Sequence, residues 1–119
     1  IRLYNQMFDI SLNAGFIMAG VKFEFGKDPI SDEIVLADSL GPDEFRMWTK
    51  ESYKVGAEQV SYDKQFLRDW LTKVGFRKNI KLASTDGKKP IPPKLPSNVV
   101  DELLKRYSYV YKKISKTRF

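Results

Sequence analysis

The chain has 119 residues, 42% of them apolar, with 21 Lys and Arg against 15 Asp and Glu and with no Cys or His. This length predicts one domain, and the missing Cys and His exclude thiol nucleophiles, disulfides, zinc–thiolate sites, Ser-His-Asp triads and imidazole bases, leaving the chemistry of carboxylates, lysine and arginine. No apolar run approaches the roughly 18 residues of a membrane span, and no signal-peptide pattern opens the chain, so we expect a soluble, cytoplasmic protein.

The charge is divided unevenly along the chain. Residues 1–60 carry 6 basic and 10 acidic side chains, and residues 61–119 carry 15 and 5, so the two halves have net charges of −4 and +10. A basic half is typical of a surface that binds nucleic acid or a phosphate ligand. It is equally typical of solvated Lys on helix faces and in a linker.

The first part of the chain predicts a helix followed by a hairpin. Apolar residues one turn apart predict a helix that ends at Gly15. Residues 16–25 and 33–40 predict two strands of an antiparallel hairpin. By period-two alternation, one face of the first strand carries Gly20, Lys22 and Glu24, and the other is wholly apolar, formed by Ile17, Ala19, Val21, Phe23 and Phe25.

The second part predicts a loop, two helices and a connection between them. Residues 41–43 are a Gly-Pro-Asp turn, and residues 44–60 lack a clean period and predict an ordered loop. We expect a helix capped by Ser61 and ended at Gly75, a basic, Pro-rich, extended connection over 76–96, and a final helix capped by Ser97. The predicted fold is α+β, an antiparallel sheet packed by helices, with parts 1–75, 76–96 and 97–119.

Lys22, Glu24 and Asp38 are the first candidate site residues. Lys22 and Glu24 share one strand face, and Asp38 on the neighbouring strand can approach Glu24. Two carboxylates beside a Lys suit a magnesium nucleotide, with the metal on hard oxygens and the Lys on a phosphate. A cross-strand ion pair on a solvated sheet face is the alternative interpretation.

Arg46, Asp63 and Lys64 are the remaining charged candidates. Arg46 follows a rigid turn, where a guanidinium fork suits a phosphate, although it can also be an ordinary surface Arg. Asp63 and Lys64 lie in the first turn of a predicted helix and can simply favour its dipole and solvation. We expect Trp48 and Trp70 to pack in the core rather than to stack on bases. No Gly-x-Gly-x-x-Gly or Walker-type phosphate loop occurs.

Three ordered segments resemble the SAICAR synthetase (phosphoribosylaminoimidazole-succinocarboxamide synthase) family. Residues 16–26, Phe-Ile-Met-Ala-Gly-Val-Lys-Phe-Glu-Phe-Gly, are similar to the family's second signature. Residues 38–48, Asp-Ser-Leu-Gly-Pro-Asp-Glu-Phe-Arg-Met-Trp, are similar to its Asp-Glu-apolar-x-Pro-Asp-x-Ser-Arg-x-Trp segment. Residues 52–56 and 61–71, Ser-Tyr-Lys-Val-Gly and Ser-Tyr-Asp-Lys-Gln-Phe-Leu-Arg-Asp-Trp-Leu, are similar to the longer, yeast-like members.

The resemblance implies the carboxy-terminal part of a two-lobed, ATP-using ligase of purine biosynthesis. That enzyme joins L-aspartate to carboxyaminoimidazole ribonucleotide through an acyl phosphate and gives SAICAR, ADP and phosphate. By the family's pattern, Lys22 and Glu24 are catalytic, Glu24 and Asp38 serve the Mg²⁺ of ATP, and Lys22 serves its phosphates. Arg46 serves the ribonucleotide phosphate, and Asp63 and Lys64 lie near the substrates.

The sequence also departs from that family. Gly20 stands where the signature has Asp, Ser39 where it has Glu, and Phe45 where it has Ser, which leaves open a divergent, inactive relative. The amino-terminal lobe is absent from these residues, so we expect activity only when that lobe is supplied in cis or in trans. A basic nucleic-acid-binding module is a third interpretation, drawn from the charge of residues 61–119.

Overall fold

The chain folds into helices and strands of the α+β class, as predicted. The computed structural model describes residues 1–38, 41–85, 87 and 89–116. Its strands form two antiparallel pairs, β1 with β4 and β2 with β3. The elements in chain order are α1 (Arg2–Asn13), β1 (Phe16–Val21), β2 (Glu24–Lys27), β3 (Ile34–Ala37), β4 (Phe45–Thr49), α2 (Gln65–Lys73), α3 (Phe76–Thr85) and α4 (Ser97–Ser115).

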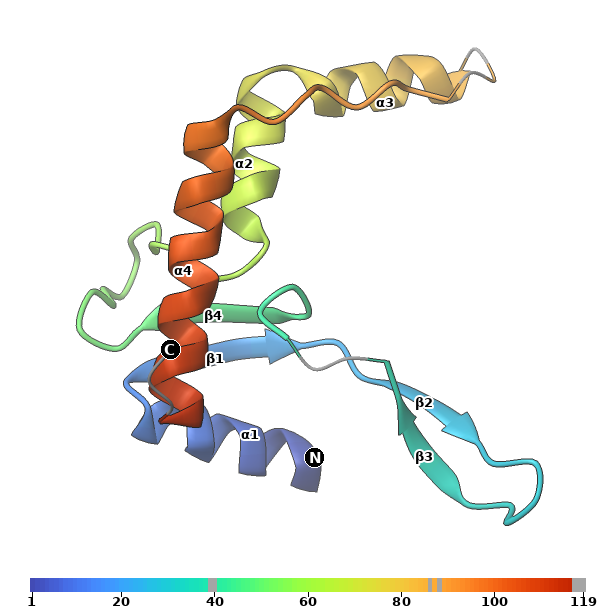
Figure 1. Cartoon of the computed structure of the whole chain (residues 1–119), viewed down its shortest axis with the longest axis vertical. Coiled ribbons are helices and arrows are strands. Elements are labelled where there is room, and N and C mark those ends of the chain that lie inside the picture. The colour runs from blue at the N-terminus through green and yellow to red at the C-terminus, as the bar shows by residue number, and fades with distance from the viewer. Residues whose placement is uncertain (39–40, 86, 88, 117–119) are drawn as a thin grey trace.

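The core lies where α1 and α4 pack on the β1–β4 pair (Figure 1). Met18 of β1 and Met47 of β4 face each other across the pair and are fully buried. Val110 of α4 closes the same cluster, and the apolar stripe of α1 packs against it. The helix predicted before Gly15 is confirmed, because its apolar spacing is the stripe that meets this core.

A β-bulge in β1 decides which side chains face the core. The register of β1 against β4 shifts between Met18 and Gly20, so Met18 pairs with Met47 while Gly20 pairs with Arg46. Since a bulge inserts one extra residue, it reverses the alternation beyond it. Therefore the prediction of one apolar face over 16–25 is wrong: the core side chains of β1 are Phe16, Met18 and Val21.

The predicted hairpin is confirmed only in its distal part. Glu24 pairs with Ala37 and Lys27 with Ile34, whereas residues 16–21 pair with β4 instead. The predicted loop over 44–60 is therefore wrong at its start, because β4 begins at Phe45. The predicted end of the second strand at residues 39–40 lies outside the described residues.

The segments after β4 also differ from the predictions. Helix α2 begins at Gln65 rather than directly after Ser61, which forms an isolated β-bridge with Trp48 instead. Gly75 ends α2 with φ of 79°, as predicted. Residues 76–85 form α3 rather than an extended connection, since all the prolines of 76–96 lie beyond it. Helix α4 begins at Ser97 as expected, but Pro96 is its N-cap residue.

The described chain is more open than a compact domain of its length. Its radius of gyration is 17.4 Å, against about 13.5 Å for a compact chain of this size. The β2–β3 hairpin projects away from the β1–β4 pair (Figure 1), with Phe25 57% and Ile34 76% exposed. None of the described helices is long and apolar enough to cross a membrane. The exposed apolar hairpin is a surface suited to packing against further polypeptide.

Candidate functional site

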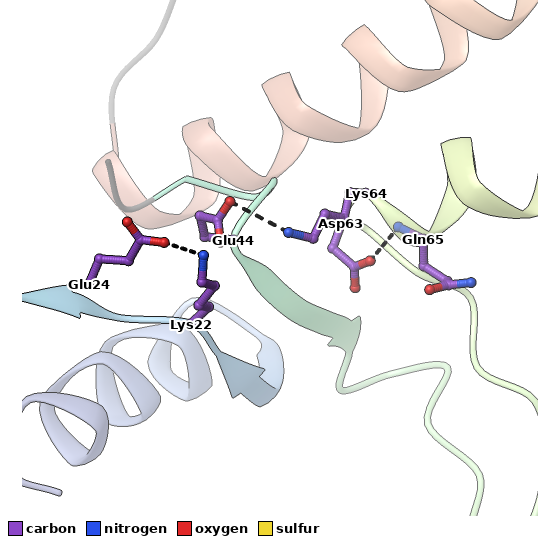
Figure 2. Close-up of polar contacts among 6 residues, drawn as sticks. All are labelled: Lys22, Glu24, Glu44, Asp63, Lys64 and Gln65. Atoms are coloured by element: carbon purple, nitrogen blue, oxygen red, sulfur yellow. Dashed lines mark hydrogen bonds and ion pairs between the residues drawn. The ribbon is translucent and has the colours of Figure 1, made fainter. Parts of the chain in front are cut away.

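Lys22 lies in the link between β1 and β2, and Glu24 is the first residue of β2. The Lys22 ammonium pairs with a carboxylate oxygen of Glu24, and both side chains are exposed (Figure 2). The backbone N–H of Lys22 donates to the carbonyl of Glu44 at 3.2 Å, which fixes the link against the residue that precedes β4. The structure thus brings Lys22 and Glu24 together although the strand that was predicted to carry both ends at Val21.

Three carboxylates affect the pKa of the Lys22 ammonium. Its pKa is raised, first by the hydrogen bond and the charge of Glu24; burial lowers it by less, and the charges of Glu44 and Asp38 add still smaller increases. Asp38 follows Ala37, the residue that pairs with Glu24 across the hairpin, and it adopts a φ of 72°. The hairpin pairing therefore brings Asp38 close to the position of Glu24, and the carboxylates favour the charged form of Lys22.

Glu44 links this cluster to the start of α2. Its carboxylate lies 3.5 Å from the Lys64 ammonium, and these two side chains are only 18% and 32% exposed. The sequence analysis missed Glu44, which stands at a variable position of the motif over residues 38–48. The only signal was its place between a Gly-Pro-Asp turn and Arg46. In Figure 2 the charged side chains form a row from Glu24 through Lys22 and Glu44 to Lys64.

Arg46 lies on the face of β4 that is turned away from the core. It pairs with Gly20 across the strands, and its guanidinium donates to the Gln65 side-chain oxygen at 3.1 Å. Gln65 is a second residue that the sequence analysis missed. The neighbouring pocket holds about 400 Å³, within the usual range for small ligands. It is lined by Arg46, Trp48, Tyr53, Lys54, Gln65 and Asp69, among others.

The prediction that Trp48 packs in the core is wrong. Trp48 is half-buried and lines this pocket rather than the core. Its ring stacks on Tyr53 with centroids 5.8 Å apart and an interplanar angle of 15°. The stack therefore forms an apolar wall of a pocket whose other lining groups include Arg46 and Asp69.

The Asp63 side chain is 0% exposed and accepts hydrogen bonds from two backbone N–H groups. One carboxylate oxygen accepts the Met47 N–H and the other accepts the Gln65 N–H, each at 2.7 Å. Asp63, rather than Ser61, therefore satisfies a donor at the start of α2, where the helix dipole also favours a negative charge.

The carboxylates of the cluster suit a Mg²⁺ that arrives with phosphates. Within the described residues no group of three or more His, Cys, Asp or Glu side chains is placed to hold a metal by itself. Mg²⁺ in nucleotide sites commonly takes one or two carboxylates, with phosphates and waters as its remaining ligands. Glu24 and Asp38 are oxygen donors of that kind on either side of the hairpin.

The three departures from the family pattern fall in different places. Phe45 is buried in the core and faces away from Arg46, its neighbour on β4, so it does not enter the polar pocket. Gly20 lies opposite Arg46, and a Cβ there would be 3.9 Å from the Cβ of Arg46, an ordinary contact. Ser39 lies outside the described residues.

The comparisons with known proteins agree on one family. A family model described as SAICAR synthetase matches residues 1–83. A phosphoribosylaminoimidazole-succinocarboxamide synthase of Nitrosopumilus maritimus is 47% identical over 97% of this chain and 41% of its own length. The Saccharomyces cerevisiae enzyme of the same name is 40% identical over 100% of this chain and 36% of its own length.

Solved structures give the same result for the fold. The SAICAR synthase of Saccharomyces cerevisiae, solved in complex with SAICAR, has a TM-score of 0.72 at 38% identity and covers 99% of this chain and 36% of its own. A SAICAR synthetase solved in complex with ADP has a TM-score of 0.61 at 23% identity, which is a likeness of fold. The strands and helices described above thus form part of a SAICAR synthetase fold.

The chain belongs to the SAICAR synthetase family. The resemblance expected from the three sequence segments is therefore confirmed, including the likeness to the yeast enzyme. The chain spans between 36% and 41% of the length of these relatives.

Proposed function

We propose that this chain contributes the described site to an ATP-dependent ligase of purine biosynthesis that joins L-aspartate to carboxyaminoimidazole ribonucleotide, giving SAICAR, ADP and phosphate. The observation that carries the proposal is the row of charged side chains from Glu24 to Lys64 beside Arg46, in a chain of this family. The yeast relative that binds SAICAR supports the choice of substrate. We place the reaction in the cytoplasm.

Activation of the substrate carboxylate is the chemical requirement. An amine does not displace oxide from a carboxylate, so the γ-phosphoryl group of ATP first passes to the carboxylate oxygen and forms an acyl phosphate and ADP. The aspartate amine then attacks the acyl carbon, and phosphate leaves as the amide bond forms. Positioning and charge stabilisation are what the protein must supply for phosphoryl transfer.

The residues of the site divide between the two ligands. Lys22 neutralises charge on the nucleotide phosphates, because its ammonium is exposed and charged at the end of β1. Glu24 and Asp38 would hold Mg²⁺, which supplies charge neutralisation on the phosphates when bound. Arg46 binds the ribonucleotide phosphate in the polar pocket, and Lys64 faces the substrates from the start of α2.

The rest of the active site is proposed to come from an amino-terminal lobe, in cis or in trans. The chain spans about two fifths of its relatives, and its β2–β3 hairpin exposes apolar side chains that such a lobe would cover. We refer to this chain together with that lobe as the complete enzyme. The test is a SAICAR-forming assay of the complete enzyme with ATP, Mg²⁺, L-aspartate and carboxyaminoimidazole ribonucleotide, in which absence of product would reject the proposal.

Gly20→Asp tests the alternative of a divergent, weakly active relative. Because the added Cβ meets only an ordinary contact with Arg46, we expect the variant to fold with its midpoint of thermal unfolding unchanged within about 2 °C. Turnover of the complete enzyme should stay within about threefold of the parent, since the Lys22–Glu24 pair is already formed with Gly at position 20. A large rise in turnover would instead identify Gly20 as an impairing residue.

A further inference from the structure

Asp63 joins two segments that carry the site, the strand β4 and the start of α2. The Met47 N–H that it accepts follows Arg46 directly, and the Gln65 N–H that it accepts belongs to the residue whose side chain receives the Arg46 guanidinium. The backbone directly after Arg46 and the backbone of Gln65 are therefore both hydrogen-bonded to the Asp63 carboxylate. Figure 2 shows the hydrogen bond between Asp63 and Gln65.

The backbone of residues 61 and 62 positions the Asp63 carboxylate beside β4. The Tyr62 N–H donates to the Met47 carbonyl at 2.9 Å, and Ser61 forms a β-bridge with Trp48, so residues 61 and 62 line the outer edge of β4. At Asp63 the chain turns into α2, and a side-chain oxygen replaces the backbone carbonyl that would otherwise accept the Met47 N–H. A buried N–H left without an acceptor is costly, and so is a buried carboxylate without donors.

A clamp from α4 holds the same turn. The Arg106 guanidinium donates to the Ser61 carbonyl at 2.6 Å and lies 4.3 Å from the centre of the Phe66 ring. Glu102 in turn accepts from Arg106 at 2.8 Å. The turn that contains Asp63 is thus held by β4 on one side and by Arg106 of α4 on the other. The Asp63 carboxylate therefore has a fixed position from which it can orient the residues bonded to it.

We propose that Asp63 is a positioning residue, which acts through Met47 and Gln65 to set the Arg46 guanidinium for the phosphate of the ribonucleotide substrate. This inference rests on the proposed function for the identity of that substrate. It makes the expectation that Asp63 lies near the substrates more specific: the carboxylate is fully buried and both its oxygens accept from backbone donors, so it acts through its neighbours.

Asp63→Asn in the complete enzyme is the first test. The amide has one acceptor oxygen, so one of the two backbone N–H groups loses its partner. We expect the KM for carboxyaminoimidazole ribonucleotide to rise about tenfold, with kcat and the KM for ATP within about twofold. Amide hydrogen exchange at Met47 or Gln65 should become faster. Asp9→Asn, on the exposed surface of α1, is the matched control and should change none of these quantities.

Two further variants separate positioning from general stability. Gln65→Ala leaves the Asp63–backbone bonds in place and removes the acceptor for Arg46, together with an exposed hydrogen bond from the Gln65 amide to Asp69. It should therefore raise the same KM with little change in thermal stability. In an Arg46→Lys background, Asp63→Asn should add less than twofold, because residues that act through one group are not additive. If Asp63→Asn does not fold, Gln65→Ala still tests whether the Arg46 guanidinium must be held by Gln65 for ribonucleotide binding.

The outcomes that reject the inference are distinct from those that reject the function. An unchanged KM in Gln65→Ala and Asp63→Asn, or full multiplication of the effects of Asp63→Asn and Arg46→Lys, would show that Asp63 does not act through Arg46. If the parent enzyme forms no SAICAR, the proposed function fails. Unchanged exchange at both Met47 and Gln65 in Asp63→Asn would then still overturn the positioning role.

Discussion

Lys22→Met in the complete enzyme is expected to lower kcat about 100-fold to 1000-fold, the usual effect of removing one preorganised charge from a phosphoryl-transfer or acyl-transfer site. Met keeps the length of the side chain but removes the ammonium that pairs with Glu24. Thermal stability should change little, because this ion pair is exposed and such pairs contribute little to folding. Steady-state kinetics with ATP varied would measure the effect.

Lys27→Met provides the matched control for that prediction. Lys27 is also exposed, lies on β2 and pairs with Asp32 at the tip of the same hairpin, so the substitution is chemically identical. It should leave kcat unchanged within about twofold. Normal turnover of Lys22→Met would remove Lys22 from the site, and an equal loss in both variants would assign the effect to the hairpin as a whole.

The sequence was sufficient for the elements whose apolar pattern is local. Helix α1 was predicted because its apolar residues recur at each turn and meet one core, and the distal hairpin because turn residues separate two short apolar runs. Strand β4 was missed because its pairing is remote: Thr49 pairs with Phe16. Its five residues include strand-favouring Phe, Trp and Thr, but they are too few to show a clean period-two alternation.

Lys22 and Glu24 were predicted to lie together, and they do, but the alternation used to predict it does not hold because of the bulge in β1. Strict alternation placed Lys22 and Glu24 on one face of a ten-residue strand, whereas the strand ends at Val21 and the extra residue shifts the phase. The two side chains meet because Lys22 lies in the short link after β1 and Glu24 begins β2, two residues further along the chain. Nothing in the local sequence marks a bulge, since its register is set by β4.

Some residues of the candidate site were predicted from the sequence, whereas others could be recognised only from tertiary contacts. Residue type and the family motifs predicted Lys22, Glu24, Asp38 and Arg46 as site residues, and their roles stay predictions. Glu44 and Gln65 gain their meaning only from tertiary contacts, to Lys64 in one case and to Arg46 in the other. The burial of Asp63 could not be seen either, because it depends on residues 61 and 62 lying along β4.

Arg46→Leu in the complete enzyme is expected to raise the KM for carboxyaminoimidazole ribonucleotide about 100-fold, while the KM for ATP stays within about twofold. A guanidinium that binds a phosphate through charged hydrogen bonds contributes roughly 3 kcal/mol, which corresponds to that factor. Arg46 is half-buried on β4 and lines the polar pocket, where Lys54 is the other cationic lining residue.

Arg46→Lys and Arg77→Leu make this prediction specific. Lys keeps the positive charge but lacks the planar fork, so its KM for the ribonucleotide should lie between those of the parent and Arg46→Leu. Arg77 is exposed on α3, away from β4, and its replacement by Leu should leave both KM values unchanged. If Arg46→Leu raised the KM for ATP instead, the pocket beside β4 would belong to the nucleotide, and the assignment of the two phosphate sites to Lys22 and Arg46 would have to be exchanged.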